Sequence, residues 1–163
     1  AFGASVIVTA GSDEKCRFCE SLGADHALNY RTQDWEADAK VLVDGGVDVV
    51  LDMVAGPYMQ KNLNVLKRDG RYVIIAFLQG SSADLDMRRV LGQRLTITGS
   101  TLRPQTTVEK AAIAGGILEH VTPLLESGRV RPIIHETFPL IEAGRAHALM
   151  ESSVHMGKIV LEI

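Results

Sequence analysis

Short runs of apolar, β-branched residues alternate along this chain with longer amphipathic stretches. The first unit is an apolar run at 6–8, followed by a turn at Gly11 and Ser12 and by a helical spacing of Cys16, Cys19 and Leu22. This alternation is typical of βα units, in which helices cover a parallel sheet. The nearly unbroken apolar centre of 48–53 fits a strand that is buried on both faces. The pattern therefore predicts an α/β protein with a doubly wound parallel sheet.

The same periodicities give an expected element order for the whole chain. Ser12 is expected to cap the first helix, Pro57 to stand in the first turn of the third, and Gly115, Gly116 and Pro123 to interrupt the long helical stretch. Strands are expected at 6–8, 26–30, 48–53, 71–77, 95–99, 133–138 and 157–163, and helices at 12–23, 33–44, 57–70, 84–92, 107–127 and 139–150.

The composition narrows the possible classes of protein. The chain has 163 residues, of which 46% are hydrophobic, and a net charge of −3, so it can bury an apolar core. A near-neutral charge argues against nucleic-acid or membrane-surface binding, and no apolar run approaches the ~20 residues that cross a bilayer. The presence of only two cysteines fits a reducing cytosol. We expect a cytoplasmic protein that has a small-molecule partner.

The start of the chain predicts that it is a fragment of a longer protein. It opens without methionine and passes at once from 1–4, which resemble a helix end, into an apolar strand. If the complete sheet has the strand order 3-2-1-4-5-6, the strand lacking here is the central one, between 6–8 and 49–51. We expect that this strand lies outside the sequence, or that its two neighbours close up or recruit a strand from another chain.

Ligands of such sheets bind outside the carboxyl ends of the strands. The loops at 9–15, 29–31, 53–56, 77–82 and 100–103 carry glycines, hydroxyls, two amides and three cations, which suits a phosphate-bearing ligand. A glycine-rich G-x-G-x-x-G turn is absent from the sequence.

Lys15 is the most informative residue in these loops. An acidic residue usually ends the second strand of sites that bind the ribose 2′-hydroxyl of NAD, whereas here the first visible strand runs into Gly11, Ser12 and Lys15. A carboxylate would repel a 2′-phosphate, while a hydroxyl and a cation would hold one. The alternative is that Lys15 is an ordinary solvated helix residue.

The order of these segments resembles the quinone oxidoreductase, or zeta-crystallin-like, branch of the medium-chain dehydrogenase/reductase superfamily. The segments that carry the resemblance are 8–15, 22–25, 29–31, 46–52, 70–73, 146–151 and 157–161. It implies a Rossmann-like dinucleotide-binding domain that lacks its first βα unit. It also implies NADPH-dependent, zinc-independent transfer of hydride to a quinone or enone, with a substrate domain in front of this chain.

The resemblance also assigns the cofactor-binding residues. Residues near the first two strands would surround the 2′-phosphate and adenosine, with Arg31 as an additional contact. Two later loops would contact the nicotinamide chiefly through backbone groups. An ordinary connection is the alternative for the second of those loops, since Phe77 and Leu78 are bulky. The complete set is Gly11, Ser12, Lys15, Tyr30, Arg31, Val54, Gly56, Phe77 and Leu78.

Domain organisation and assembly follow from the same resemblance. Residues 1–127 would form the partial dinucleotide-binding domain, and 128–163 would return to the substrate domain. The strand expected at 95–99 is the last of the parallel sheet, and an apolar, unbulged edge invites pairing. Related dehydrogenases join two subunits at this edge, so we expect a homodimer with an antiparallel, two-fold pairing of this strand.

No other motif competes strongly with this interpretation. Cys16 and Cys19 lie one helical turn apart without the further ligands that zinc needs, and we interpret them as structural residues; the five histidines are scattered. Asp48 is expected at a strand start, and Asp52 is expected to orient the loop after its strand. The absence of an acid/base pair suits hydride transfer, in which the cofactor carries the chemistry.

Two alternatives remain open from the sequence. The chain could serve only as a nucleotide-binding or dimerisation module, or it could be a fragment of a zinc-dependent alcohol dehydrogenase relative. The residues upstream of Ala1 and metal analysis of the whole protein would discriminate between them.

Overall fold

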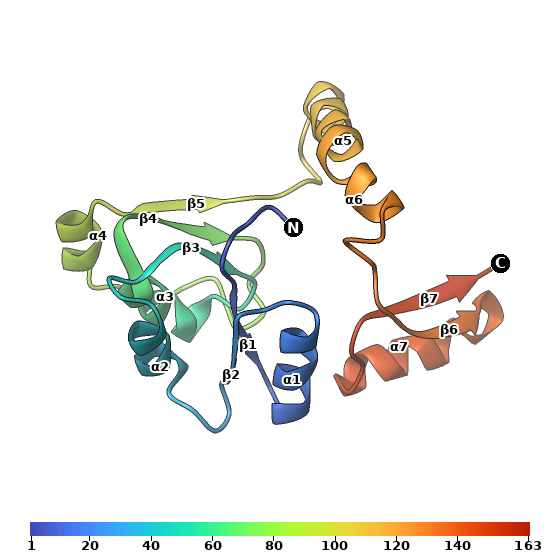
Figure 1. Cartoon of the computed structure of the whole chain (residues 1–163), viewed down its shortest axis with the longest axis horizontal. Coiled ribbons are helices and arrows are strands. Elements are labelled where there is room, and N and C mark those ends of the chain that lie inside the picture. Colours follow the sequence, from blue (N-terminus) through green and yellow to red (C-terminus); the bar gives the residue numbers. More distant parts are fainter.

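The computed structural model describes residues 1–163 and has the expected α/β architecture (Figure 1). Single 3₁₀ turns at Gly56–Tyr58 and Leu140–Glu142 precede two of the helices. The other elements are β1 (Ile7–Ala10), α1 (Asp13–Ser21), β2 (His26–Asn29), α2 (Trp35–Leu42), β3 (Val47–Asp52), α3 (Met59–Val65), β4 (Leu66–Ile74), α4 (Arg88–Gln93), β5 (Thr96–Gly99), α5 (Thr107–His120), α6 (Thr122–Glu126), β6 (Ile134–Pro139), α7 (Ala143–Ser152) and β7 (Lys158–Glu162).

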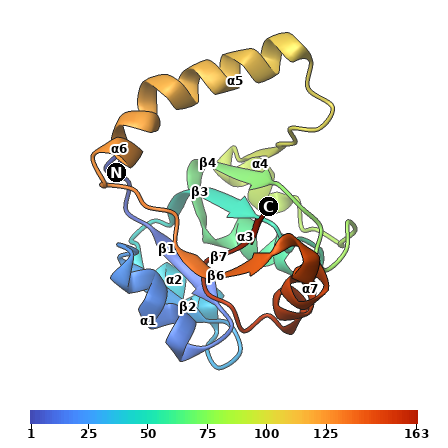
Figure 2. The ribbon, with the colours of Figure 1, turned by 90° about the vertical axis from the view of Figure 1, so that its right-hand side faces the viewer.

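The strands form three separate parallel sheets rather than a single one. β1 pairs with β2, β4 pairs with both β3 and β5, and β6 pairs with β7. In Figure 1 the strands of the first two sheets follow the spatial order β2, β1, β3, β4, β5, and Figure 2 shows the same order for β2, β1, β3 and β4. This is the expected doubly wound order without its central strand. No hydrogen-bonded ladder joins β1 to β3, so these two strands have not closed up against each other.

One apolar cluster joins the first two sheets. Its buried members are Leu28 of β2, Trp35 and Ala39 of α2, and Val65 of α3. Partly buried side chains from β1 and β3 pack against these four residues, as does Tyr58, whose ring stacks on Trp35 with centroids 5.4 Å apart. Helices α2 and α3 therefore hold the two sheets beside each other without main-chain pairing between the sheets.

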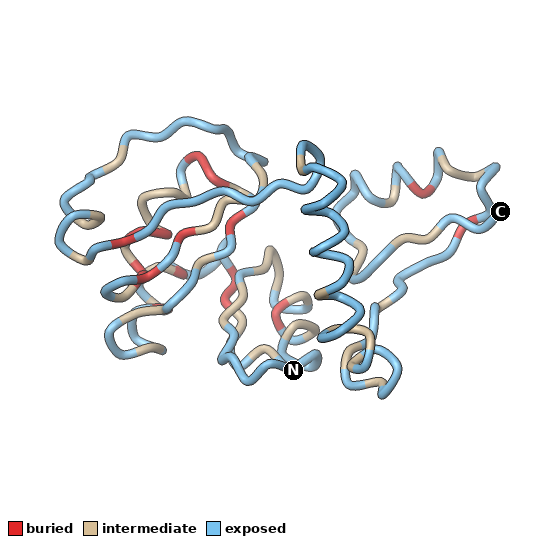
Figure 3. Tube along the Cα trace, turned by 90° about the horizontal axis from the view of Figure 1, so that it is seen from above, coloured by how far each residue is buried: buried red, intermediate tan, exposed pale blue.

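A second cluster fixes β4 against α3, which precedes it, and α4, which follows it. Leu63, Leu66 and Tyr72 are fully buried there, and Leu95 completes the group. Few residues outside these two clusters are buried, and most of the trace in Figure 3 is exposed. The accessible surface is 11316 Å², whereas a compact monomer of this mass exposes roughly 8000 Å². Much apolar surface, including Val49 and Leu51 of β3, faces solvent.

The third helix ends earlier than expected, at Val65 rather than at 69–70. Leu66 is extended and begins β4, and Arg89 donates hydrogen bonds to the main-chain oxygens of Asn64 and Leu66 at 3.1 and 2.8 Å. Residues 67–70 of β4 then bulge opposite Asp48, which forms an ion pair with Lys67 at 2.6 Å. Arg89 thus supplies donors to carbonyl oxygens that the end of the helix leaves without partners. The helix can therefore end at Val65 without leaving these oxygens unpaired.

Two other helix predictions also need correction. The helix expected at 84–92 is reduced to α4, and the long stretch divides at Val121 into α5 and α6. Pro123 stands in the first turn of α6, as a break there requires, but α5 runs through Gly115 and Gly116 without interruption. A mid-helix glycine costs only about 1 kcal/mol relative to alanine, so it weakens a helix without breaking it.

The C-terminal elements form a body of their own. β6 and β7 pair in parallel, with α7 as the crossover between them, and α5 and α6 link this body to the first two sheets (Figures 1 and 2). This arrangement is consistent with the expectation that 128–163 belong to the substrate domain. That assignment remains a prediction. None of the helices is both long enough and apolar enough to cross a membrane.

The cluster around Trp35 gives a testable expectation for stability. Trp35 is only 6% exposed, and replacing it with alanine removes contacts that join two sheets, so Trp35→Ala should lower the free energy of unfolding by about 3–5 kcal/mol. Urea unfolding followed by circular dichroism measures this loss. Val41→Ala is the matched control on α2, since Val41 is 85% exposed, and it should change stability by less than about 0.5 kcal/mol. Equal effects of the two substitutions would contradict the proposed role of the cluster.

Candidate functional site

The predicted residues near β1 and β2 come together at the carboxyl ends of these strands. Gly11 follows β1, and a Cβ atom placed on it would lie 2.6 Å from the Tyr30 hydroxyl and 3.5 Å from Nε of Arg31. Tyr30 and Arg31 directly follow β2, which pairs with β1. Gly11 is therefore the residue that lets an aromatic hydroxyl and a guanidinium approach the turn into α1.

Ser12 and Lys15 complete this group from the first turn of α1. The Ser12 hydroxyl accepts a hydrogen bond from the Lys15 backbone N–H at 3.2 Å, which confirms the predicted helix cap. The Lys15 ammonium donates to the main-chain oxygen of Ser153, at the end of α7. Lys15 thus lies where α1 meets the C-terminal body, and no carboxylate pairs with its ammonium.

Sequence reasoning missed Asn29, which organises the turn after β2. Asn29 is buried; its amide nitrogen donates to Asp13 at 2.6 Å, and its amide oxygen accepts from the Arg31 backbone N–H at 3.1 Å. The contact occupies one oxygen of the Asp13 carboxylate, two residues before Lys15. A strand-terminal Asn is a common turn residue, and its contact with Asp13 depends on β1–β2 pairing, which the sequence does not show.

The predicted residues near β3 and β4 form a second group. The Leu78 N–H donates to the oxygen of Met53 at 3.1 Å, and the Gln79 N–H donates to that of Val54 at 2.8 Å. These bonds join the loop at 53–56 to the loop at 77–80. We refer to the two loops together as the paired loops.

Gly56 is required where the paired loops touch. Its φ is +49°, and a Cβ atom there would lie 2.3 Å from the main-chain oxygen of Gln79. On the other loop, Phe77 and Leu78 remain 55% and 73% exposed. The paired loops therefore combine close main-chain contact with an open apolar surface. No hydrogen bond joins them to the residues at the ends of β1 and β2, namely Gly11, Ser12, Lys15, Tyr30 and Arg31, which we call the Gly11–Tyr30 group.

Asp52 organises the first of these loops, as predicted. One oxygen of its buried carboxylate accepts hydrogen bonds from the N–H groups of Val54 at 2.7 Å and Ala55 at 3.1 Å. The other oxygen accepts from the Asn62 amide at 2.8 Å and from the Tyr72 hydroxyl at 2.6 Å. Burial and the hydrogen bond to Asp52 raise the pKa of Tyr72 far above that of a free tyrosine.

The other residues considered in the sequence are the two cysteines and the histidines. Cys16 is buried, and burial together with Asp13 raises the pKa of its thiol; both cysteines are free. His135 and His155 approach each other with ring centroids 6.3 Å apart. No group of three or more His, Cys, Asp or Glu side chains is placed to hold a metal ion.

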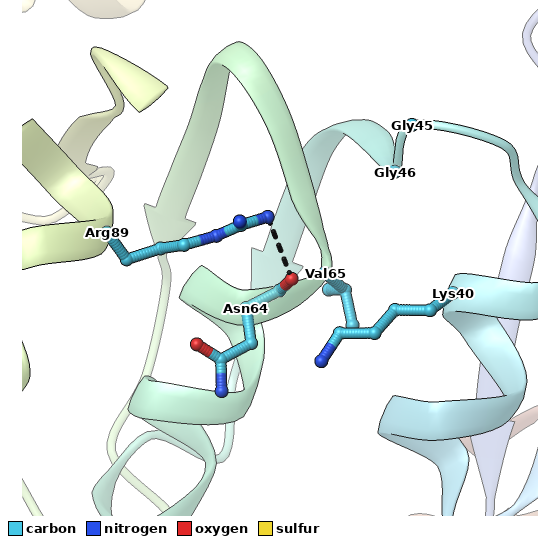
Figure 4. A pocket seen from close by; sticks show the side chains of 6 residues that line it. All are labelled: Lys40, Gly45, Gly46, Asn64, Val65 and Arg89. Carbon is cyan, nitrogen blue, oxygen red and sulfur yellow. Dashed lines mark hydrogen bonds between the residues drawn. The ribbon is translucent and has the colours of Figure 1, made fainter. Parts of the chain in front are cut away.

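A pocket of about 300 Å³ lies away from the predicted site (Figure 4). Its lining residues precede β3 and β4 or belong to the adjoining helices, so it opens at the amino ends of these strands rather than at their carboxyl ends. Arg89 crosses it and bonds to main-chain oxygens at the end of α3. Its lining is Lys40, Gly45, Gly46, Asn64, Val65 and Arg89, none of which is a predicted cofactor residue.

With this geometry established, comparison with known proteins identifies the family. Residues 22–161 match the family described as zinc-binding dehydrogenase. The chain therefore belongs to the zinc-binding dehydrogenase family, within the medium-chain dehydrogenase/reductase superfamily, as the resemblance implied.

Individual relatives agree with this assignment. "Quinone oxidoreductase-like protein 2" of Bos taurus is 38% identical over 97 residues, which are 59% of this chain and 28% of the relative. The crystal structure of an NAD-dependent alcohol dehydrogenase superposes with a TM-score of 0.80 at 30% identity, over 99% of this chain and 45% of that one.

Escherichia coli quinone oxidoreductase complexed with NADPH gives a TM-score of 0.79 at 26% identity, over 98% of this chain and 50% of that one. The chain thus spans at most half the length of these three proteins.

The raised pKa of Tyr72 predicts a pH dependence of stability. The phenol stays protonated in the folded protein at pH values where the unfolded chain, with a pKa of about 10, loses its proton. Its contribution to the free energy of unfolding is therefore complete below about pH 9 and is lost as the pH rises above about 10.

Urea unfolding of the unaltered chain and of Tyr72→Phe, compared over that range, tests this expectation. The stability advantage of the unaltered chain should shrink as the pH rises. Burial also raises the pKa of Tyr58, but its effect on stability is the same in both proteins and cancels in the comparison. A constant difference across the range would show that Tyr72 titrates alike in both states.

Proposed function

We propose that the chain forms the cofactor-binding part of an NADPH-dependent oxidoreductase that transfers hydride to a quinone or a conjugated carbonyl. The observation that carries the proposal is the group of Gly11, Ser12, Lys15, Tyr30 and Arg31 at the ends of β1 and β2. It offers hydroxyls, an ammonium and a guanidinium where a carboxylate would favour the 2′-hydroxyl of NAD. Charge-assisted contacts of this kind suit a 2′-phosphate.

The paired loops supply a suitable environment for the reactive end of the cofactor. NADPH itself supplies the hydride, so the protein has to position the nicotinamide and exclude water. The open side chains of Phe77 and Leu78 provide apolar surface, and the fixed main chain of 53–56 provides polar groups beside it. These residues orient the ring without donating or accepting a proton.

We propose that the reaction needs no zinc, as the resemblance to the quinone oxidoreductase branch implies. The alternative is a zinc-dependent alcohol dehydrogenase relative that uses NAD. The observation in support of this alternative is the likeness to an NAD-dependent alcohol dehydrogenase. Metal analysis of a protein that carries this chain at its relatives' length separates the two: stoichiometric zinc needed for turnover would support the alternative.

The two free cysteines and the absence of any disulfide support a reducing compartment, and we propose a cytoplasmic location.

Cofactor choice is tested by replacing Lys15. In a protein of the relatives' length, Lys15→Ala should weaken NADPH binding by roughly 1–3 kcal/mol, because a charge-assisted contact to the 2′-phosphate is lost, and should leave NADH binding unchanged. Titration calorimetry with both cofactors measures this difference. Lys40→Ala is the control, since Lys40 pairs with Glu36 on α2, away from the site. Equal losses for NADPH and NADH would remove Lys15 from the 2′-phosphate.

We also propose that two copies pair in antiparallel fashion through β5. This strand ends the second sheet, all its residues are exposed, and only its β4 side is paired.

Proline at Ile97 tests this pairing. Since the Ser100 N–H donates to Ile74 of β4, the alternation of the strand directs the N–H of Ile97 outward. Ile97→Pro should therefore abolish dimers in sedimentation at micromolar concentration while β4–β5 pairing survives. Leu91→Lys, on the open face of α4, should leave the dimer intact. A monomeric unaltered protein would refute the proposal.

A further inference from the structure

The buried carboxylate of Asp52 meets only hydrogen-bond donors. Asp52 is 5% exposed, and its four partners are two backbone N–H groups, the Asn62 amide and the Tyr72 hydroxyl, at 2.6–3.1 Å. These donors come from the loop after β3, from α3 and from β4. A single acceptor group therefore fixes three separate pieces of the chain around the end of β3.

The loop that Asp52 holds has an unfavourable main-chain conformation. Ala55 has φ +57° and ψ −144°, which side-chain-bearing residues rarely adopt, and it is completely buried. Its N–H points at both oxygens of Asp52, each 3.1 Å away. The carboxylate stabilises a turn that the chain would otherwise avoid.

This turn also determines where the second loop lies. Val54, whose N–H is bound by Asp52, accepts through its oxygen the hydrogen bond from Gln79, and Gly56 touches the same residue. Displacement of 54–56 would therefore displace 77–80. Both halves of the paired loops depend on the contacts of Asp52.

We propose that Asp52, with Asn62 and Tyr72, is the positioning residue that fixes the paired loops against the reactive end of the bound dinucleotide. This inference rests on the proposed function and adds to it that two separate groups of residues determine cofactor affinity and hydride transfer. The Gly11–Tyr30 group determines affinity for the 2′-phosphate end, and Asp52 determines how well hydride is transferred.

The chemistry of the site suggests a sharp substitution. Asp52→Asn keeps the shape but replaces one acceptor oxygen and the negative charge with an NH₂ group, so the four donors have one acceptor oxygen in place of two. Adding Asn62→Asp exchanges the two side chains and restores an acceptor opposite the new amide. Asp48→Asn, at the exposed start of β3, is the matched control.

Two measurements follow on these variants. In this 163-residue chain, Asp52→Asn should speed hydrogen exchange of the Val54, Ala55 and Gln79 amides by about tenfold or more, and the double exchange should reverse much of that increase.

In a protein of the relatives' length, Asp52→Asn should lower kcat with NADPH by about tenfold or more. The dissociation constant of adenosine 2′,5′-bisphosphate should stay within about twofold, because the two groups share no contact. The double exchange should recover kcat, and Asp48→Asn should leave all three quantities unchanged.

The outcomes separate this inference from the proposed function. Unchanged amide exchange and unchanged kcat in Asp52→Asn would overturn the inference, as would equal losses of kcat and bisphosphate affinity, which would indicate general unfolding. If the unaltered protein neither binds the bisphosphate nor oxidises NADPH, the proposed function fails. Amide exchange alone then decides whether Asp52 fixes the paired loops.

Discussion

The apolar cluster around Trp35 is the contact on which the arrangement of the first two sheets depends. Parallel sheets are normally continuous and covered on both faces, because every internal strand needs a hydrogen-bonded neighbour on each side. Here β1 and β3 each have a paired side and an open side, so the main chain does not hold the two sheets together. Helices α2 and α3 do so instead, through side chains that reach residues of β1, β2 and β3. The relative position of the sheets therefore depends on side-chain packing.

The second constraint is the set of main-chain contacts at the carboxyl ends of the strands. At β1 and β2, a glycine allows Tyr30 and Arg31 to approach the turn into α1. At β3 and β4, another glycine allows two loops to touch, and a buried carboxylate holds the strained residue beside it. In both places a side chain would block the contact. Gly11 and Gly56 are thus required because Tyr30 and the main chain of Gln79 approach them closely.

Local chemistry explains which features the sequence could predict. Ser12 as a cap and Asp52 as the organiser of its loop were predictable, because each acts on N–H groups within three residues of itself. The end of α3 was not, because the helical spacing continues past Val65 and the arginine that satisfies the last carbonyls lies on a later helix. Asn29 and Tyr72 were missed for the same reason: their decisive partners are 16 and 20 residues away in sequence. Roles that depend on strand pairing become visible only in the fold.

The two constraints together set a geometric requirement on function. A dinucleotide has a fixed reach, so the groups that hold its two ends must keep a fixed separation. In this chain the candidate phosphate group belongs to the β1–β2 sheet and the paired loops belong to the β3–β4–β5 sheet, and no hydrogen bond joins the two groups. Their separation is therefore set by the cluster around Trp35, which lies at neither end. Packing changes in that cluster would alter the proposed hydride transfer without touching a residue of the proposed cofactor site, because they would move one end of that site relative to the other.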